Sequence, residues 1–326
     1  MCSTGPSSRD SFPVSELRFA DCDQLSDLVS GGDVEFIQLG AGASKGGMMR
    51  IDLEGVFLLL ADVPNRSACH AASKKGLRVV QVPLRWSRSL HWNGKALDRP
   101  GVMIWGDSCE FCRVGDDLSV LTVAIDESML RKQIEVWGPS SHSRWDSFNG
   151  QMLADTPAAH RFIETVKWVI ELATHTPERL GFPEVRTQLR EQVLLALFEA
   201  AEAPGDHVLL GNPTTQKRTR IVRRMTDYLL AHPHRKMELS DLCQLTGSSA
   251  RSIAHACQTV LRTSPMRYLK QLRLNRARIL LRKGSREVTS VSECAHFAGF
   301  SHLGRFSADY RRMFGESPAQ TLDRST

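Results

Sequence analysis

The chain has 326 residues, of which 41% are hydrophobic, 24% charged and 7% aromatic. This length is typical of about two domains, and this composition excludes disordered, collagenous and coiled-coil proteins. No apolar run reaches the roughly 18 residues of a membrane span, and the first residues lack the apolar core of a secretory signal. We therefore expect a cytoplasmic protein with no membrane partner.

The net charge of +6 is distributed unevenly along the chain. Residues 217–326 carry 21 basic and 8 acidic side chains, whereas residues 1–216 carry 21 basic and 28 acidic ones. Because nucleic acids are polyanions, basic charge concentrated in one third of a chain indicates a nucleic-acid-binding domain. On charge alone, a solvated basic surface is an equal alternative.

Residues 12–125 have the pattern of a β-rich domain. Apolar and polar residues alternate at Met49–Leu53 and at Val80–Trp86, which is the two-residue period of a half-buried strand. An Asn93-Gly94 pair predicts a tight hairpin turn. Trp86, Trp92 and Trp105 could line an apolar ligand pocket or fill the core. Strands are predicted at 49–53, 56–62, 80–86, 102–105 and 118–125, a series typical of a sandwich or small barrel.

Three helices are predicted after these strands. The first begins at Asp126, a residue type that caps helices, and ends near Trp137. After a loop predicted at 138–150, two amphipathic helices are predicted at 157–174 and 184–202. They could pack on the β-rich region or pair with a second chain. We favour a homodimer, because proteins that read DNA commonly work in pairs.

Two segments of the C-terminal region repeat a helix-turn-helix pattern. The motif C-x-x-x-G-x-S at Cys243–Ser249 recurs as A-x-x-x-G-x-S at Ala295–Ser301, 52 residues further on. The small first residue lets two helices cross closely, the glycine permits a turn with positive φ, and the serine caps the second helix. A Ser-Pro-x-x-x-Leu motif at 264–269 also recurs, at 317–322.

The segment between the two copies predicts one long helix. It starts at Ser264-Pro265 and ends at Gly284, so both ends carry helix-terminus signals. The helical residues 265–282 would span about 27 Å at ~1.5 Å per residue, close to the roughly 34 Å between successive major-groove segments on one DNA face. One chain is therefore expected to read two adjacent groove segments.

Two stretches of the C-terminal region carry the residues of a known family. Gly299–Ala319 (GFSHLGRFSADYRRMFGESPA) contains Gly-Phe, a Phe with an aromatic residue four positions on, and Gly-x-Ser-Pro; Ser249–Leu281 covers the first repeat copy and the long helix. Over 217–326 the chain resembles the AraC/XylS-type transcription regulators. The resemblance implies a seven-helix domain with two helix-turn-helix motifs, and more often activation than repression. Over 12–125 it is compatible with the cupin-like β-domain of relatives, which senses a small molecule or mediates dimerisation.

Helix phase selects the residues that could contact DNA bases. The first predicted reading helix, 249–262, turns Ile253, Cys257 and Val260 inward, and the second, 301–314, turns aromatic residues inward. Arginine suits guanine, histidine can donate or accept at a base edge, and leucine can contact a thymine methyl. The family resemblance points to the same early helix positions. The predicted base contacts are Ser249, Arg251, His255, His302, Leu303, Arg305, Ser307 and Arg311.

A second group of basic residues is predicted to contact phosphates, which position a protein without specifying sequence. For any one of these residues a solvated surface charge is the alternative. The predicted phosphate contacts are Arg273, Arg276, Arg282, Lys283 and Arg312.

The β-rich region lacks the residues of a metal-dependent enzyme. A catalytic cupin needs a His-x-His pair plus a carboxylate, whereas residues 1–140 contain only His70 and His91. Cys109 and Cys112 form an isolated CxxC with no second ligand pair, and we interpret them as reduced structural thiols. We therefore predict no enzyme activity, no catalytic residue, no metal and no cofactor.

Together these patterns predict an α+β protein. It comprises a β-rich cupin-like sandwich at 10–140, a helical linker at 141–210 and an all-α domain with two helix-turn-helix motifs at 213–326. The boundary falls in residues 203–216, which contain Pro, Gly and Asn.

The predicted function is sequence-specific DNA binding by a transcription regulator, an activator by resemblance, whose N-terminal domain senses an unknown small molecule, dimerises, or does both. One alternative is an enzyme or DNA-repair sensor fused to a DNA-targeting module, with Cys109 or Cys112 as its reactive thiol. Another is an N-terminal domain that only dimerises. The expected partners are double-stranded promoter DNA and a second copy of the chain; RNA polymerase and a small-molecule effector are further candidates.

Overall fold

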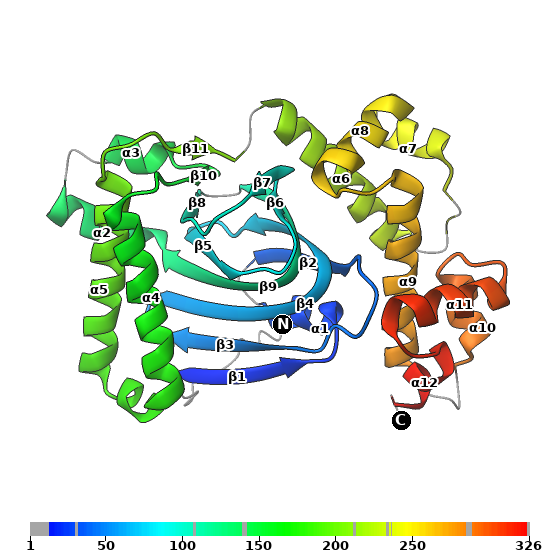
Figure 1. Ribbon diagram of the computed structural model, residues 1–326, viewed down its shortest axis with the longest axis horizontal. Coiled ribbons are helices and arrows are strands. Elements are labelled where there is room, and N and C mark those ends of the chain that lie inside the picture. Colours follow the sequence, from blue (N-terminus) through cyan, green and yellow to red (C-terminus); the bar gives the residue numbers. More distant parts are fainter. Residues whose placement is uncertain are drawn as a thin grey trace, which may run out of the picture.

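A curved antiparallel sheet forms the first half of the molecule (Figure 1). The structure is a computed structural model that describes residues 13–29, 32–106, 109–138, 142–210, 213–232, 235, 237–284 and 289–324. Within these residues the strands are β1 (Val14–Phe19), β2 (Gly32–Gln38), β3 (Gly46–Asp52), β4 (Val56–Ser73), β5 (Leu77–Arg85), β6 (Leu90–Trp92), β7 (Lys95–Leu97), β8 (Met103–Trp105), β9 (Glu110–Asp126), β10 (Gln151–Met152) and β11 (Val208–Leu209).

Two long bent strands, β4 and β9, organise this sheet. They pair with each other along most of their length, with a shift of register between Val63 and Arg66. The first half of β4 also pairs with β3, and its second half pairs with β2. The hydrogen-bonded order is β1-β3-β4-β9-β5-β8-β10-β11, with β2 added to β4 and the β6–β7 hairpin added to β9. The sheet therefore curves back on itself and encloses apolar side chains.

Most predicted strands are confirmed, and the differences concern their length and partners. The segments predicted at 56–62 and 118–125 are parts of the longer β4 and β9. The predicted hairpin turn is confirmed, because Asn93 and Gly94 have φ values of 48° and 81° between β6 and β7. The segment 203–216, predicted as the domain boundary, contains β11, which pairs with β10.

Helices cover one end of the sheet. They are α2 (Glu127–Trp137), α3 (His142–Ser147), α4 (Pro157–His175) and α5 (Pro183–Glu202), with a 3₁₀ turn at Pro177–Gly181. Helix α1 (Cys22–Leu28) lies instead toward the other end of the sheet, on the side of the C-terminal helices (Figure 1). The predictions of α2, α4 and α5 are confirmed, whereas α3 lies in a segment that was predicted as a loop. Phe162, Val166 and Val193 are buried in one core with Leu58 and Val123 of the sheet. The apolar faces of α4 and α5 therefore pack on their own β-rich region.

The C-terminal part is helical throughout its described residues. Its helices are α6 (Pro213–Ala231), α7 (Leu239–Thr246), α8 (Ala250–Val260), α9 (Pro265–Lys283), α10 (Val291–Phe297), α11 (Leu303–Phe314) and α12 (Pro318–Asp323). The predicted long helix is confirmed as α9, with Ser264 capping its first turn and Gly284 at its end. One apolar core joins α6 to α8 and α9, and a second joins α9 to α10, α11 and α12. No helix in the described part of the chain is long and apolar enough to cross a membrane.

The outer face of the sheet packs against these C-terminal helices. Ile37, Ala68 and Cys112 of the sheet share one buried core with Val260 and Tyr268. Polar contacts reinforce this interface, which joins β2, β4 and β6 to α8 and α9. They are Gln271 Nε2 to the Leu39 carbonyl at 2.6 Å, Asn275 Nδ2 to the Gln38 carbonyl at 3.0 Å, and Arg262 Nη2 to His91 Nε2 at 2.9 Å.

Candidate DNA interface

Helices α7 and α8 form the first helix pair, and its turn follows the predicted chemistry. Gly247 ends α7 in the left-handed conformation with φ 61°, and its N–H donates to the Cys243 carbonyl. The Ser249 hydroxyl then accepts the N–H of Ser252 and caps α8. Both predicted features, the glycine turn and the serine cap, are confirmed.

The phase of α8 leaves one face free of packing. Ile253, Cys257 and Val260 are fully buried, as the apolar period predicts. Arg251 and His255 point away from the core and are exposed, and the His255 ring lies 3.3 Å from the Thr259 hydroxyl one turn on. This face presents a guanidinium and an imidazole, two groups that hydrogen-bond to base edges.

Helices α10 and α11 form the second pair, whose turn is longer. Gly299 has φ 82°, so the predicted glycine turn is confirmed. The prediction that Ser301 caps the next helix is wrong: α11 is preceded by His302, whose side chain makes no capping bond. The Phe300 N–H donates to the Ala295 carbonyl, as the Ser248 N–H does to the Cys243 carbonyl in the first pair, and the ring centroids of Phe300 and Phe306 lie 4.9 Å apart.

The second pair also has a clear inner and outer face. Phe306, Tyr310 and Phe314 are buried and contact one another in series. The outward positions carry basic and small residues. Of the predicted base contacts on both pairs, Ser307 is half-buried, and the others are exposed: Ser249, Arg251, His255, His302, Leu303, Arg305 and Arg311.

The predicted phosphate contacts occupy three different environments. Lys283 and Arg312 are exposed, and Arg312 lies 3.3 Å from Asp309. Arg273 and Arg276 are half-buried, and each has a buried Nε without a hydrogen-bond partner among the described residues. Burial lowers the pKa of Arg273. Their remaining nitrogens are the groups that could approach a phosphate.

Arg282 differs from the other predicted phosphate contacts, because it forms an ion pair with Asp21 of the β-rich part. Its Nη1 donates to Asp21 Oδ2 at 2.5 Å. Arg278, one turn earlier on α9, donates to the same oxygen at 3.1 Å and to Glu316 at 2.9 Å. The Asp21 carboxylate is almost completely buried. Arg282 is therefore part of the interface between the sheet and α9, which the helix phase did not predict.

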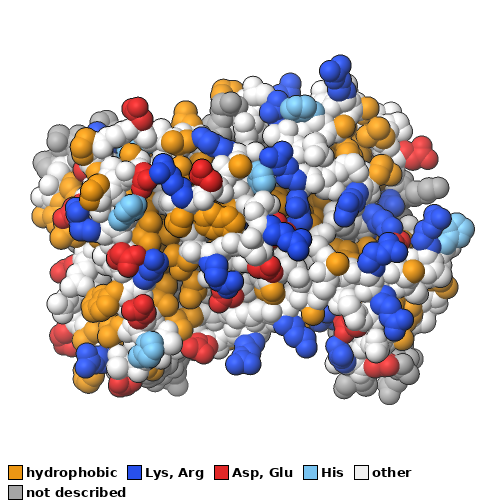
Figure 2. Space-filling view, viewed as in Figure 1, with side chains coloured by type: hydrophobic (Ala, Val, Ile, Leu, Met, Phe, Trp, Pro, Cys, Tyr) orange, Lys and Arg blue, Asp and Glu red, His pale blue; other side chains and the backbone are white. Residues whose placement is uncertain are grey.

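Basic side chains gather over the C-terminal helices. Figure 2 shows Lys and Arg concentrated on that half of the face in view, whereas acidic and hydrophobic side chains are frequent over the β-rich part and its helices. The charge asymmetry of the sequence is thus an asymmetry of the surface. A surface of this kind attracts the phosphate backbone and steers association with it.

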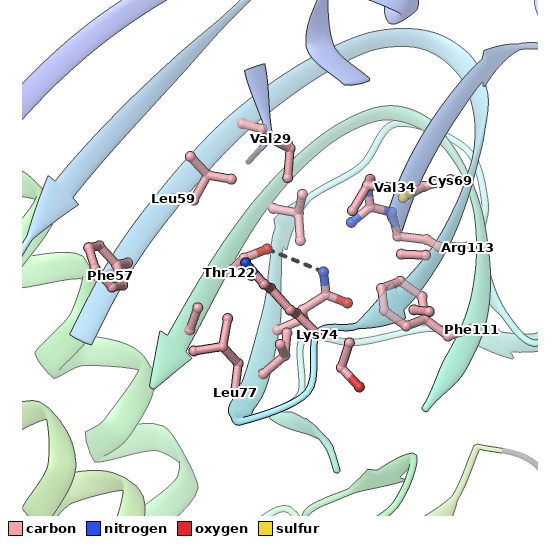
Figure 3. Close-up of a pocket in the computed structure, with 18 of the residues that line it drawn as sticks. Val29, Val34, Phe57, Leu59, Cys69, Lys74, Leu77, Phe111, Arg113 and Thr122 are labelled. Carbon is pink, nitrogen blue, oxygen red and sulfur yellow. Dashed lines mark hydrogen bonds between the residues drawn. The ribbon is translucent and has the colours of Figure 1, made fainter. Parts of the chain in front are cut away.

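A cavity opens inside the curved sheet (Figure 3). It has a volume of about 310 Å³, and side chains of β2, β4, β5 and β9 line it. None of the three tryptophans predicted to line a pocket is among the described residues that line this cavity. Trp92 and Trp105 are buried with ring centroids 6.3 Å apart, and Trp105 stacks at 4.8 Å on Phe111, which does line the cavity. Trp86 packs at the edge of the same core.

The two cysteines of the CxxC motif have the properties of inert thiols. Burial raises the pKa of Cys109 to about 11, and it also raises the pKa of the fully buried Cys112. A reactive cysteine needs a lowered pKa, because the thiolate is the nucleophile. In the part of the chain that the structure describes, no group of three His, Cys, Asp or Glu side chains could hold a metal ion. The raised pKa values do not fit Cys109 or Cys112 as the reactive thiol of the enzyme alternative.

The chain matches one protein family and several curated regulatory proteins. A family described as a helix-turn-helix domain matches residues 242–324. The probable thc operon regulatory protein of Rhodococcus erythropolis is 30% identical over 204 residues, 62% of this chain and 60% of that protein. The XylDLEGF operon transcriptional activator of Pseudomonas putida is 33% identical over 163 residues, 49% and 48% of the two chains.

A solved structure matches the same region. A probable AraC family transcriptional regulator from Rhodopseudomonas palustris is 42% identical, covering 32% of this chain and 97% of that one, with a TM-score of 0.30. The family match and the motifs described above show a helix-turn-helix domain in the C-terminal part of the chain. Over its C-terminal helices the chain is similar to regulators of the AraC/XylS type. It spans less than two thirds of the length of the two operon regulators.

Proposed function

We propose that the protein is a sequence-specific regulator of transcription that binds promoter DNA through the outer faces of α8 and α11. The observation that carries the proposal is the pairing of these two exposed faces, each following a glycine turn, on either side of the single helix α9. Each face carries arginine and histidine, which are suited to base edges, on a basic surface suited to phosphates.

Selection of bound sequences from a pool of random double-stranded DNA tests this proposal with the full chain. We expect one enriched, asymmetric motif and an affinity that falls steeply with salt, because phosphate neutralisation releases counterions. A variant with both Arg251→Ala and Arg305→Ala should bind the pool but enrich no motif. Failure of the full chain to retain DNA at low salt would contradict the proposal.

The domain organisation predicted from the sequence is part of the same proposal. They are a cupin-like sandwich at 10–140, a helical linker at 141–210 and two helix-turn-helix motifs within 213–326. The enclosed cavity supports a sensing role for the first of these regions. Activation is supported by the relatives that are named as transcriptional activators. RNA polymerase is the partner that activation would require.

The homodimer remains part of the proposal, with α4 and α5 as its contact. The inner faces of these two helices pack on the sheet. On their outer faces, Trp168 and Leu195 are 46% and 43% exposed and line a common groove. Large apolar side chains gathered on an outer surface favour protein contacts. Sedimentation should show a dimer that Trp168→Glu converts to a monomer, while Lys167→Glu, next to it on α4, leaves the dimer intact. A monomeric wild-type chain would remove this part of the proposal.

A further inference from the structure

The cavity inside the sheet is mostly apolar but contains one buried cation. Val34, Phe36, Ala71, Phe111 and Val120 are among the side chains that line it (Figure 3). Its volume of about 310 Å³ lies at the small end of the roughly 300–1,000 Å³ typical of small-molecule sites. Such a cavity suits a compact organic molecule with an apolar body.

Arg113 of β9 is the buried cation, and no acidic side chain that the structure describes pairs with it. The residue is 3% exposed and lines the cavity. Its guanidinium lies 5.9 Å from the Phe36 ring centroid and 5.5 Å from that of Trp92. Among the residues that the structure describes, it makes no hydrogen bond and no ion pair. A buried charge without a partner is unfavourable, because burial removes its hydration and nothing replaces it.

The rest of the lining also favours an anion. Among the described residues that line the cavity there is no Asp or Glu, whereas Arg50 and Lys74 lie there as further, exposed cations. One more polar group is left open: Gln81 donates from Nε2 to the Thr122 hydroxyl at 3.2 Å, but its Oε1 is buried without a partner (Figure 3). An occupant with an N–H or O–H group would satisfy this oxygen.

We propose that this cavity binds an apolar organic carboxylate, with the carboxylate paired to Arg113 and the apolar body against Phe36, Phe111 and Val120. The planar guanidinium of arginine matches a carboxylate in a two-bond geometry, which a lysine would not reproduce. The proposal identifies the chemical class of the molecule that the proposed regulator senses, and it therefore rests on the proposed function. Its test does not, because binding is measured on the protein without DNA.

Calorimetric titration of the full chain tests the proposal with three acids and their primary amides. The acids are benzoate, 3-phenylpropanoate and octanoate, so that aromatic and aliphatic sources of the carboxylate are distinguished. We expect at least one acid to bind at least tenfold more tightly than its own amide. The proposal is overturned if no acid binds, or if each acid and its amide bind equally.

Variants of Arg113 test whether the preference for an acid over its amide depends on this residue. Arg113→Gln should reduce the acid-to-amide preference to about one, and Arg113→Lys, which keeps the charge in case the first variant misfolds, should keep only part of it. Arg85→Gln is the matched control, because Arg85 lies exposed on β5 beside Asp62 and outside the cavity. Undiminished preference in a folded Arg113→Gln protein would overturn the proposal. A wild-type chain that binds an acid but no DNA would contradict the proposed function alone.

Discussion

The Nε2 atom of His70 lies 3.0 Å from the hydroxyl oxygen of Tyr268, and this contact joins strand β4 to the connecting helix α9. Tyr268 shares a second hydrogen bond, of 2.8 Å, with the Thr226 hydroxyl on α6. The neighbour of His70 on the strand, Cys69, faces the other way and lines the cavity. Because side chains alternate along a strand, the same stretch of β4 contacts the cavity on one face and the DNA-binding helices on the other.

The buried imidazole predicts a pH-dependent stability. Burial, and to a smaller extent the nearby charge of Arg223, lowers the pKa of His70 to about 3 from an ordinary value of 6.5. Between these values the unfolded chain binds a proton that the folded chain does not, so stability is complete above 6.5 and falls as the pH falls. From pH 7 to pH 5 His70 should contribute a loss of about 2 kcal/mol.

Chemical denaturation at pH 7, 6 and 5 measures this contribution. Burial also lowers the pKa values of His91 and His207, so the slope of wild type against pH contains several groups. The informative quantity is the difference between wild type and His70→Gln, whose stability should depend less steeply on pH. Equal slopes for the two proteins would contradict the prediction.

Replacing Asp21 should loosen α9 from the β-rich part. Asp21→Asn keeps an oxygen that can cap α1 through the Gln24 N–H but removes the charge that holds Arg278 and Arg282. Hydrogen bonds to charged groups contribute about 1.5–3 kcal/mol, so the free energy of unfolding should fall by that order. The freed Arg282 should add a phosphate contact, raising the affinity for random DNA and steepening its salt dependence by about one unit of slope.

Thermal melting and salt titrations of random-DNA binding measure the two effects of Asp21→Asn. Asp52→Asn is the matched control, because Asp52 is exposed on the sheet and lies 4.0 Å from Arg50, away from α9. The control should change neither quantity by much. Lower stability with an unchanged salt slope would mean that Arg282 does not reach DNA.

Arginines on different elements should separate specificity from affinity. Arg251→Ala, on the exposed face of α8, should cost about 1–3 kcal/mol on the selected sequence and relax preference at one base position. Arg273→Ala, on α9, should weaken binding to all sequences alike and flatten the salt slope. Competition binding with the selected and a scrambled sequence distinguishes them. Equal losses on both sequences for Arg251→Ala would remove that residue from the base contacts.

Local chemistry explains which parts of the structure could be predicted. The turns at Gly247 and Asn93-Gly94 and the caps at Ser249 and Ser264 depend on residues within a few positions of one another, and all are confirmed. The outward face of α8 follows from a period of 3.6 residues alone. These features need no knowledge of the rest of the chain.

Features that depend on distant residues were not predictable in this way. Helix phase placed Arg282 outward, but only the folded chain shows that Asp21 is its partner. The inner face of the cavity depends on the pairing of three strands: Phe36 of β2 lies opposite Cys69 of β4, and Cys69 lies opposite Arg113 of β9. Nothing near Arg113 in the sequence distinguishes it from an exposed strand arginine.

The two helix pairs predict a fixed geometry on DNA. Helix α9 contains 19 residues and is about 28 Å long at ~1.5 Å per residue, and each of its two halves is packed in the core of one pair. The pairs should therefore reach two major-groove segments on one DNA face, about one turn or 10 bp apart. The site of one protomer should be asymmetric, because α8 and α11 carry different outward residues. A dimer should add a second such site, as a direct or inverted repeat.

Inserting five base pairs between the two halves of one protomer's site tests this geometry. The insertion turns one half to the opposite DNA face, which the short turns around α9 cannot follow, so specific binding should be lost. Five base pairs added outside the site should leave affinity unchanged and serve as the control. Gel-shift titrations with the three duplexes give the measurement. If the internal insertion left affinity unchanged, only one helix pair would read DNA, and the other would serve to support the packing of α9.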